Sequence, residues 1–343
     1  MVNVMPTARD VAKRAGVSQS TVSRVLNNYV HVRPDVRDRV LHAMKELQYQ
    51  PNEVARSLVT QRSRSIGLVL GETSNPFFAE TAKSIVEVCQ GFGYCVILST
   101  TDSRPDLLPD SLRLLRSQQV EGLIIGAVEK DDSVVAELVA SGFPCVFYNR
   151  VLNTNSGSYV ILNNVRGGHM MTEHLLGLGH RRIAVLTGPQ KFSTFAHRLE
   201  GYAAALREQG IAFDSQLVLQ YSVYTADRTK AIKRLLGLKN PPDAIFAMTD
   251  SMALEVMDTV LQLGLRVPED IAVVGFDDIA LASHHRICLT TIAQHRQLMG
   301  RLAAEALLEQ INARAEGRTV QPTRIVLEPQ LVIRHTCGSP IQR

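Results

Sequence analysis

A short helix predicted after Ser18 separates its apolar side chains from its polar ones. Its polar face carries Gln19, Ser20, Ser23 and Arg24. In the major groove of double-stranded DNA, arginine can donate two hydrogen bonds to guanine, and glutamine can pair in the same way with adenine. Because an ordinary solvated helix also has a polar face, this pattern needs support from the elements around it.

The neighbouring elements supply that support. The run Thr7-Ala8-Arg9-Asp10 is a capping-box pattern for a first helix, Gly16 ends it, Ser18 can cap the second helix, and Pro34 suits the start of a third. A helix, a tight glycine turn and a second helix within about 20 residues is the layout of a helix-turn-helix.

Charge and composition divide the chain into a basic head and a larger body. Residues 1–64 carry 11 Lys and Arg against 5 Asp and Glu, a net charge of +6, within a chain of 343 residues and net charge +4. A basic head on a slightly acidic body favours a polyanion-binding module joined to a second function.

The 45% hydrophobic content excludes a disordered chain. No apolar run could span a membrane, Met1–Arg14 lacks a signal-peptide core, and the five cysteines form no CxxC pair. We therefore expect a cytoplasmic protein with reduced thiols.

The body alternates strand-length apolar runs with amphipathic stretches. The strand candidates are Ile66–Leu70, Cys95–Leu98, Gly122–Ile125, Cys145–Tyr148, Ile183–Leu186, Ala244–Met248 and Ile271–Phe276. Examples of the helix candidates are Phe78–Gln90, Val134–Ala140, His197–Gln209, Ala226–Leu236 and Met252–Leu263. This alternation predicts an α/β body of doubly wound parallel sheets. The series starts again near residues 163–168, which predicts two lobes.

Polar and aromatic side chains follow the predicted strands. They include Asn75, Phe77, Asn149, Arg150, Phe192, Thr194, Arg198, Thr249 and Asp277. Since ligands of open α/β sheets bind beyond the carboxyl ends of the strands, these residues indicate a pocket for a small polyol between the lobes. No nucleotide-binding glycine loop, nucleophile elbow or metal-binding histidine pair occurs, so we expect no catalytic residue, no metal and no cofactor.

Residues 7–58 resemble the headpiece and hinge of the lac repressor/galactose repressor family. The resemblance rests on Thr7–Asn27 (TARDVAKRAGVSQSTVSRVLN) and Gln48–Leu58 (QYQPNEVARSL). It implies a DNA-binding transcription regulator, most simply a repressor, that binds a near-palindromic operator as a homodimer. The DNA contacts it implies are Thr7, Ser18, Gln19, Ser20, Thr21, Ser23, Arg24, Asn27, His31, Asn52, Ala55, Arg56 and Leu58. Leu58 stands where the family wedges a leucine into the minor groove.

The same resemblance extends through the body and implies a periplasmic-binding-protein-like core. It places effector contacts at Phe77, Phe78, Asn149, Arg150, Phe192, Thr194, Arg198, Val223 and Asp277. Phe192, Val223 and Arg150 replace the residues that the purine-binding branch uses, which favours a sugar or sugar-acid effector. We expect Arg198 and Asp277 on opposite walls of the cleft, clamping one ligand. Arg150 and Arg198 together favour an anionic sugar, and the alternative is that one of the two forms a structural salt bridge instead.

The predicted organisation is a helix-turn-helix headpiece at 1–50, a hinge at 51–64 and a core at 65–337. Within the core, one lobe takes 65–163 and 293–322, and the other takes 164–292 and 323–337. A homodimer is expected because the residues from Thr336 onward contain no apolar heptad. The alternatives are a different metabolite or a protein corepressor, a soluble sugar receptor, and a carbohydrate-active enzyme. The receptor leaves residues 7–58 unexplained, and the enzyme lacks a catalytic constellation.

Overall fold

The computed structural model describes residues 6–26, 29, 31–49, 62–102, 104–154, 156–220 and 228–339. The chain separates into two compact units, Met1–Ser63 and Arg64–Arg343. The predicted hinge contacts Asn52, Ala55, Arg56 and Leu58, together with Asn27 and Val223, lie outside the described residues.

In its described residues, the first unit contains the helices α1 (Ala8–Ala15), α2 (Gln19–Leu26) and α3 (Pro34–Glu46). Thr7 and Asp10 form the capping box of α1, and Gly16 ends that helix with a φ of 65°, a conformation that favours glycine. The three helices bury one small apolar core, made of Val11, Ala12, Ala15, Val22, Val25, Val40 and Ala43. This core fixes which face of α2 remains outside.

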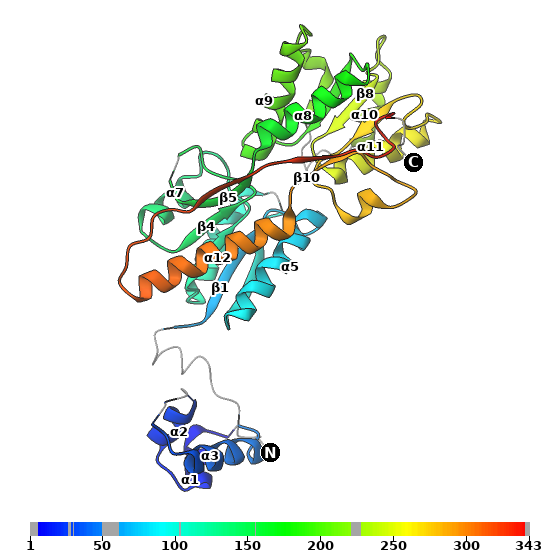
Figure 1. The fold of residues 1–343 in the computed structure, drawn as a ribbon. Coiled ribbons are helices and arrows are strands. Elements are labelled where there is room, and N and C mark those ends of the chain that lie inside the picture. The colour runs from blue at the N-terminus through cyan, green and yellow to red at the C-terminus, as the bar shows by residue number, and fades with distance from the viewer. Residues whose placement is uncertain are drawn as a thin grey trace. The chain divides into compact units, whose positions relative to one another are not determined.

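The second unit begins with a six-stranded parallel sheet in the order β11-β5-β4-β3-β1-β2 (Figure 1). Its strands are β1 (Ser65–Leu70), β2 (Cys95–Thr100), β3 (Gly122–Ile125), β4 (Cys145–Tyr148), β5 (Ser158–Leu162) and β11 (Arg324–Leu327). The helices of this lobe are α5 (Pro76–Gly91), α6 (Leu108–Ser117), α7 (Ser133–Ala140) and α12 (Arg296–Ala315), with a short 3₁₀ turn, η1 (Pro105–Leu107). α12 packs along α5.

The second lobe is built on a four-stranded parallel sheet in the order β7-β6-β8-β9. Its strands are β6 (Ile183–Thr187), β7 (Val218–Gln220), β8 (Ala244–Ala247) and β9 (Ala272–Val274). Its helices are α8 (Asn164–Gly177), α9 (Ser193–Glu208), α10 (Arg228–Leu236) and α11 (Asp250–Gln262), with 3₁₀ turns η2 (Ser215–Leu217) and η3 (Ala280–Ser283). A small all-α unit followed by two parallel-sheet lobes confirms the predicted fold class.

Three crossings join the lobes. The chain leaves the first sheet after β5, returns between β10 (Thr291–Ala293) and α12, and leaves again after β11. It then forms β12 (Gln330–Val332), which pairs antiparallel with β10. The crossing predicted near residue 322 lies a few residues later, because β11 lies parallel to β5 in the first sheet and so keeps residues 324–327 in the first lobe. Among the described residues, no helix is long and apolar enough to cross a membrane.

Candidate functional site

The outer face of α2 is polar and exposed. Gln19, Ser20, Ser23 and Arg24 are exposed, whereas Val22 and Val25 are buried against α1 and α3. The helix start is fixed by Ser18, whose hydroxyl accepts a hydrogen bond from the backbone N–H of Thr21 at 3.2 Å. A two-turn helix with this division of residues can lie in a major groove and present its outer side chains to base edges.

The other candidate DNA contacts of this unit have local partners. The hydroxyl of Thr7 lies 2.7 Å from the Asp10 carboxylate, so it belongs to the cap of α1. His31 is exposed and its ring lies edge-on to Tyr29, with 6.4 Å between the centroids. Thr21 is half-buried and its hydroxyl bonds that of Ser18. The DNA contacts of these residues stay predictions.

A cavity of about 320 Å³ lies between the two lobes of the second unit. Both lobes contribute to its wall, which consists of Glu72, Ser74, Asn75, Phe78, Arg150, Gly188, Pro189, Phe192, Phe195, Thr249, Ser251, Met252 and Glu255. The lobes also touch directly, since Lys191 Nζ lies 2.6 Å from Glu129 Oε1 and the backbone N–H of Val151 donates to Ser193 Oγ at 3.0 Å. The cavity therefore lies in a cleft between lobes already in contact.

The predicted effector residues divide into two groups. Phe78, Arg150 and Phe192 line the cavity. Phe77, Asn149, Thr194, Arg198 and Asp277 are all buried and do not line it. Sequence reasoning did not select Glu72, Phe195, Ser251, Met252 or Glu255. The last three lie on the first turns of α11, where the helical register after Thr249 could have indicated them.

The prediction that Arg198 and Asp277 face each other across the cleft is wrong. Arg198 lies on α9 and Asp277 follows β9, so both belong to the second lobe, with Arg198 Nη1 3.7 Å from Asp277 Oδ1. The guanidinium of Arg198 also donates to Asn164 Oδ1 at 2.8 Å and to the backbone carbonyl of Met248. It stacks 3.5 Å above the centroid of the Phe276 ring. Arg198 is thus held by its own lobe on every side.

The Asp277 carboxyl is buried with unequal surroundings for its two oxygens. Oδ1 accepts a hydrogen bond from the Gln294 side chain, whereas Oδ2 has no partner. Asp277 has a φ of 126°, in a region that non-glycine residues rarely occupy. Burial raises the pKa of Asp277 to about 7, and nearby Arg198 opposes the rise. Burial thus disfavours the charged form of this carboxyl, and the guanidinium of Arg198 favours it.

Asp250 holds the loop that contains Asp277 through two hydrogen bonds. Its carboxylate accepts hydrogen bonds from the Thr291 hydroxyl at 2.6 Å and the backbone N–H of Ile279 at 2.8 Å. Burial raises the pKa of Asp250 to about 6. Thr249 is the N-cap of α11, and its hydroxyl accepts a hydrogen bond from the backbone N–H of Met252. Among the described residues, no group of three or more His, Cys, Asp or Glu could hold a metal ion.

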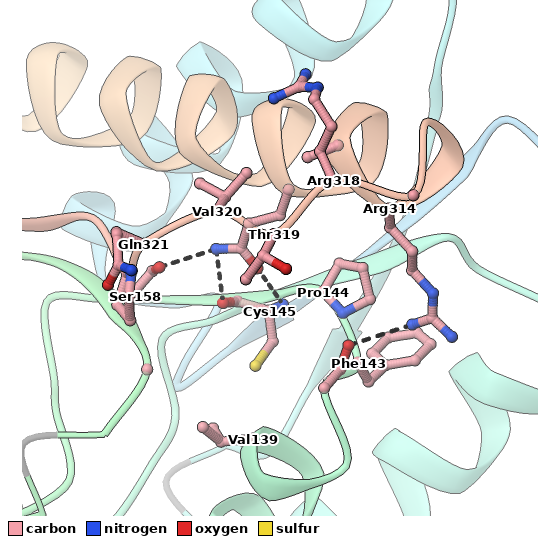
Figure 2. Close-up of a pocket in the computed structure, with 16 residues that line it drawn as sticks. Val139, Phe143, Pro144, Cys145, Ser158, Arg314, Arg318, Thr319, Val320 and Gln321 are labelled. Atoms are coloured by element: carbon pink, nitrogen blue, oxygen red, sulfur yellow. Dashed lines mark hydrogen bonds between the residues drawn. The ribbon is translucent and has the colours of Figure 1, made fainter.

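A second hollow, of about 500 Å³, lies at the amino ends of strands β4 and β5 of the first sheet, away from the interlobe cavity (Figure 2). It borders Cys145 and Ser158, the residues at which β4 and β5 begin. Gln310 also lines it, and its side-chain oxygen accepts a hydrogen bond from the backbone N–H of Cys145 at 3.0 Å. Its side-chain nitrogen donates to the backbone carbonyl of Cys145 at 3.3 Å and to Ser158 Oγ at 2.9 Å. The Arg314 guanidinium donates to the backbone carbonyl of Gly142, and Arg318 pairs with two glutamates. Because these polar groups are already paired and ligands favour the carboxyl ends of strands, the interlobe cavity is the better candidate site.

In the described residues, a small helical unit with an exposed polar face accompanies a two-lobed core that has a cavity between its lobes. This is the organisation of a ligand-responsive, two-part regulatory protein. Residues 63–329 match the family described as periplasmic binding proteins and sugar binding domain of LacI family. Residues 7–52 match the family described as bacterial regulatory proteins, lacI family. The chain belongs to the LacI family of bacterial regulatory proteins.

Relatives of known role cover nearly the whole chain. The HTH-type transcriptional regulator CelR of Thermobifida fusca is 37% identical over 340 residues, covering 96% of this chain and 98% of CelR. The HTH-type transcriptional repressor PurR of Haemophilus influenzae (strain PittEE) is 35% identical over 336 residues, covering 98% and 99%. These relatives are transcriptional regulators.

Two solved structures show the same architecture. The lac repressor dimer bound to operator and the anti-inducer ONPF is 31% identical with a TM-score of 0.84, covering 97% of this chain and 99% of that one. The CelR–cellobiose complex is 34% identical with a TM-score of 0.70, covering 96% and 99%. The family resemblance expected from residues 7–58 is thereby confirmed.

Proposed function

We propose that this protein is a cytoplasmic, non-enzymatic transcription repressor whose operator affinity is controlled by a small sugar or sugar acid in the interlobe cavity. One observation carries the proposal: a single chain joins a helix with an exposed polar face to a cavity walled by two lobes. The relatives support it, since one solved structure is a dimer on operator and another is a complex with cellobiose.

In this proposal the headpiece spans residues 1–50 and residues 51–64 form the hinge. Two protomers place their α2 helices in successive major grooves of a near-palindromic operator, and Leu58 enters the central minor groove. Effector in the cavity changes how the lobes meet, and this change alters the spacing of the two headpieces. Effector affinity and operator affinity must then be reciprocally coupled.

The test selects DNA from a random duplex pool with the full chain and then measures binding to the selected site with and without sugars. We expect a two-fold symmetric site, and an affinity that changes with at least one sugar or sugar acid. Selection of an asymmetric single half-site, or of no sequence above random DNA, contradicts the DNA-binding part. A symmetric site whose affinity no sugar or sugar acid changes contradicts the effector part alone.

A further inference from the structure

We propose that the effector is a compact sugar acid whose carboxylate binds the guanidinium of Arg150. This inference rests on the proposed function, because it names the chemical class of the ligand for the same cavity. It starts from two buried arginines in the second unit, Arg150 and Arg198. The guanidinium of Arg198 has hydrogen-bond and ion-pair partners, whereas two nitrogens of the Arg150 guanidinium have none.

Arg150 is a buried cation that makes no ion pair within 4 Å among the described residues, and the carboxylates of Glu72 and Glu129 act on it only over a longer distance. Its side chain is 5% exposed, and neither Nε nor Nη1 has a hydrogen-bond partner. Burial lowers the pKa of Arg150 to about 10, so the group stays charged at neutral pH. An unpaired buried charge is costly, and proteins rarely retain one without a use for it. Arg198, by contrast, already has the Asp277 carboxylate and two other acceptors, so it needs no ligand.

Two aromatic rings fix the orientation of the Arg150 guanidinium. Its central carbon lies 3.8 Å from the centroid of the Phe192 ring and 5.9 Å from that of Phe78. These rings come from different lobes, and all three side chains line the cavity. Stacking of this kind covers the faces of a guanidinium and leaves its N–H groups to donate in their own plane. Paired donors in one plane match the two oxygens of a carboxylate.

The rest of the wall limits the charge and size of the ligand. Glu72 and Glu255 also line the cavity, so its single cation is accompanied by two acidic groups. Both glutamates repel any anion, but they repel a phosphate dianion about twice as strongly as a monoanionic carboxylate, so the wall favours the carboxylate. The hydroxyls of Thr249 and Ser251, with the glutamates, can bond sugar hydroxyls. A volume of about 320 Å³ is at the small end of ligand sites, which favours a monosaccharide-sized acid.

The experiment measures binding to the full chain, without DNA, by calorimetry and thermal shift. The probes are five- and six-carbon aldonates and uronates, including gluconate and glucuronate, with glucose as the neutral match and glucose 6-phosphate as the phosphate match. We expect at least one acid to bind more tightly than its neutral match and than the phosphate. Arg150→Gln should weaken that acid by roughly 10- to 100-fold. Arg113→Gln is the matched control, because Arg113 is an exposed arginine on α6 that does not line the cavity, and this variant should bind the acid as well as the unchanged chain does.

The proposal is overturned if glucose or glucose 6-phosphate binds more tightly than every acid. It is also overturned if calorimetry and thermal shift detect no binding of any acid. An acid whose affinity is unchanged in Arg150→Gln overturns the role of Arg150. These outcomes leave operator selection untouched, so this failure is distinguishable from failure of the proposed function.

A second measurement needs no ligand. Arg150→Leu in the unliganded chain should raise Tm by roughly 2–4 °C, because an apolar side chain replaces an unpaired charge between the two rings. A structural arginine would instead lower Tm when replaced, and that result overturns the proposal.

Discussion

The guanidinium of Arg296 pairs with the carboxylate of Glu80, with Nε 2.9 Å from Oε2, and also donates to the backbone carbonyls of Asp277 and Asp278. Glu80 lies on α5 of the first lobe, whereas Asp277 and Asp278 belong to the loop after β9 of the second. One side chain at the start of α12 therefore fastens the two lobes together where the chain crosses between them.

Removing this fastening should loosen the lobes. Arg296→Met leaves the Glu80 carboxylate and two carbonyls without their donor, so we expect a loss of about 2–3 kcal/mol in the free energy of unfolding. Glu80→Gln retains the bonds to the second lobe and should cost about 1 kcal/mol or less. Urea unfolding of the full chain measures both. Equal losses in the two variants would show that the carbonyl contacts contribute nothing.

The close contact between α8 and α9 should tolerate no side chain at Gly168. A Cβ there would lie 2.1 Å from the backbone oxygen of Arg198, so Gly168→Ala must push the helices apart. We expect a loss of about 2 kcal/mol or more, in the range of overpacked cores. Gly177→Ala in the same helix is the control, because a Cβ there meets nothing within 4 Å. Thermal unfolding that finds Gly168→Ala as stable as Gly177→Ala contradicts the packing.

The stability of the unliganded protein should depend on pH through Asp277. Burial raises the pKa of this carboxyl from 3.8 to about 7, so the folded state holds its proton more tightly than the unfolded state does. The contribution is fully present below about pH 4 and is lost as the pH rises toward 7, by at most about 1.4 kcal/mol per pH unit. Asp277→Asn should flatten the curve in that window, although Asp250, whose pKa is raised to about 6, leaves a remnant. Chemical unfolding at a series of pH values tests this, and an unchanged slope in Asp277→Asn assigns the dependence elsewhere.

Arg24 should contribute to base recognition. Its side chain is exposed on the outer face of α2, so Arg24→Ala is expected to cost about 1–3 kcal/mol on the selected operator and to relax the base preference. Fluorescence anisotropy with the selected site and single-base variants measures both effects. An unchanged preference with weaker binding would assign Arg24 to the phosphates instead.

Leu58 should act on specific binding alone. Leu58→Ala removes the wedge proposed for the minor groove, so operator affinity should fall while salt-dependent binding to random DNA stays unchanged. Titrations at several salt concentrations separate the two. A parallel loss on both DNAs would exclude a wedge.

The sequence predicted the elements whose apolar residues form a simple pattern. The runs at Gly122–Ile125 and Cys145–Tyr148 coincide with β3 and β4, because buried parallel strands are continuously apolar. α12 was missed because it is buried around much of its circumference and so lacks a single apolar stripe. β10 and β12 have three residues each and exist only through their mutual pairing, which sequence periodicity cannot show.

The site was predicted in composition but not in arrangement. Residues that follow strands did gather at the cleft, and three of the expected effector residues line the cavity. The positions of Arg198 and Asp277 depend on which strands are neighbours. The order β6-β8-β9 brings both residues to the carboxyl ends of strands in the same sheet. The second lobe predicted over 164–292 already contains both residues, so the expected clamp across the cleft conflicted with that boundary, and the structure has an ion pair within one lobe.

The late return of the chain to the second lobe has a consequence for synthesis. Thr336 accepts a hydrogen bond from the backbone N–H of Val273 at 2.9 Å, and its hydroxyl accepts one from Thr290 at 3.0 Å. These contacts lie after every strand of the two parallel sheets in the described chain, so a polypeptide whose synthesis stops just before Thr336 would contain α1, α2, α3 and all those strands but would lack the bonds that tie the chain to β9. Such a fragment would keep the unit that we propose to bind DNA while its second lobe is incompletely closed.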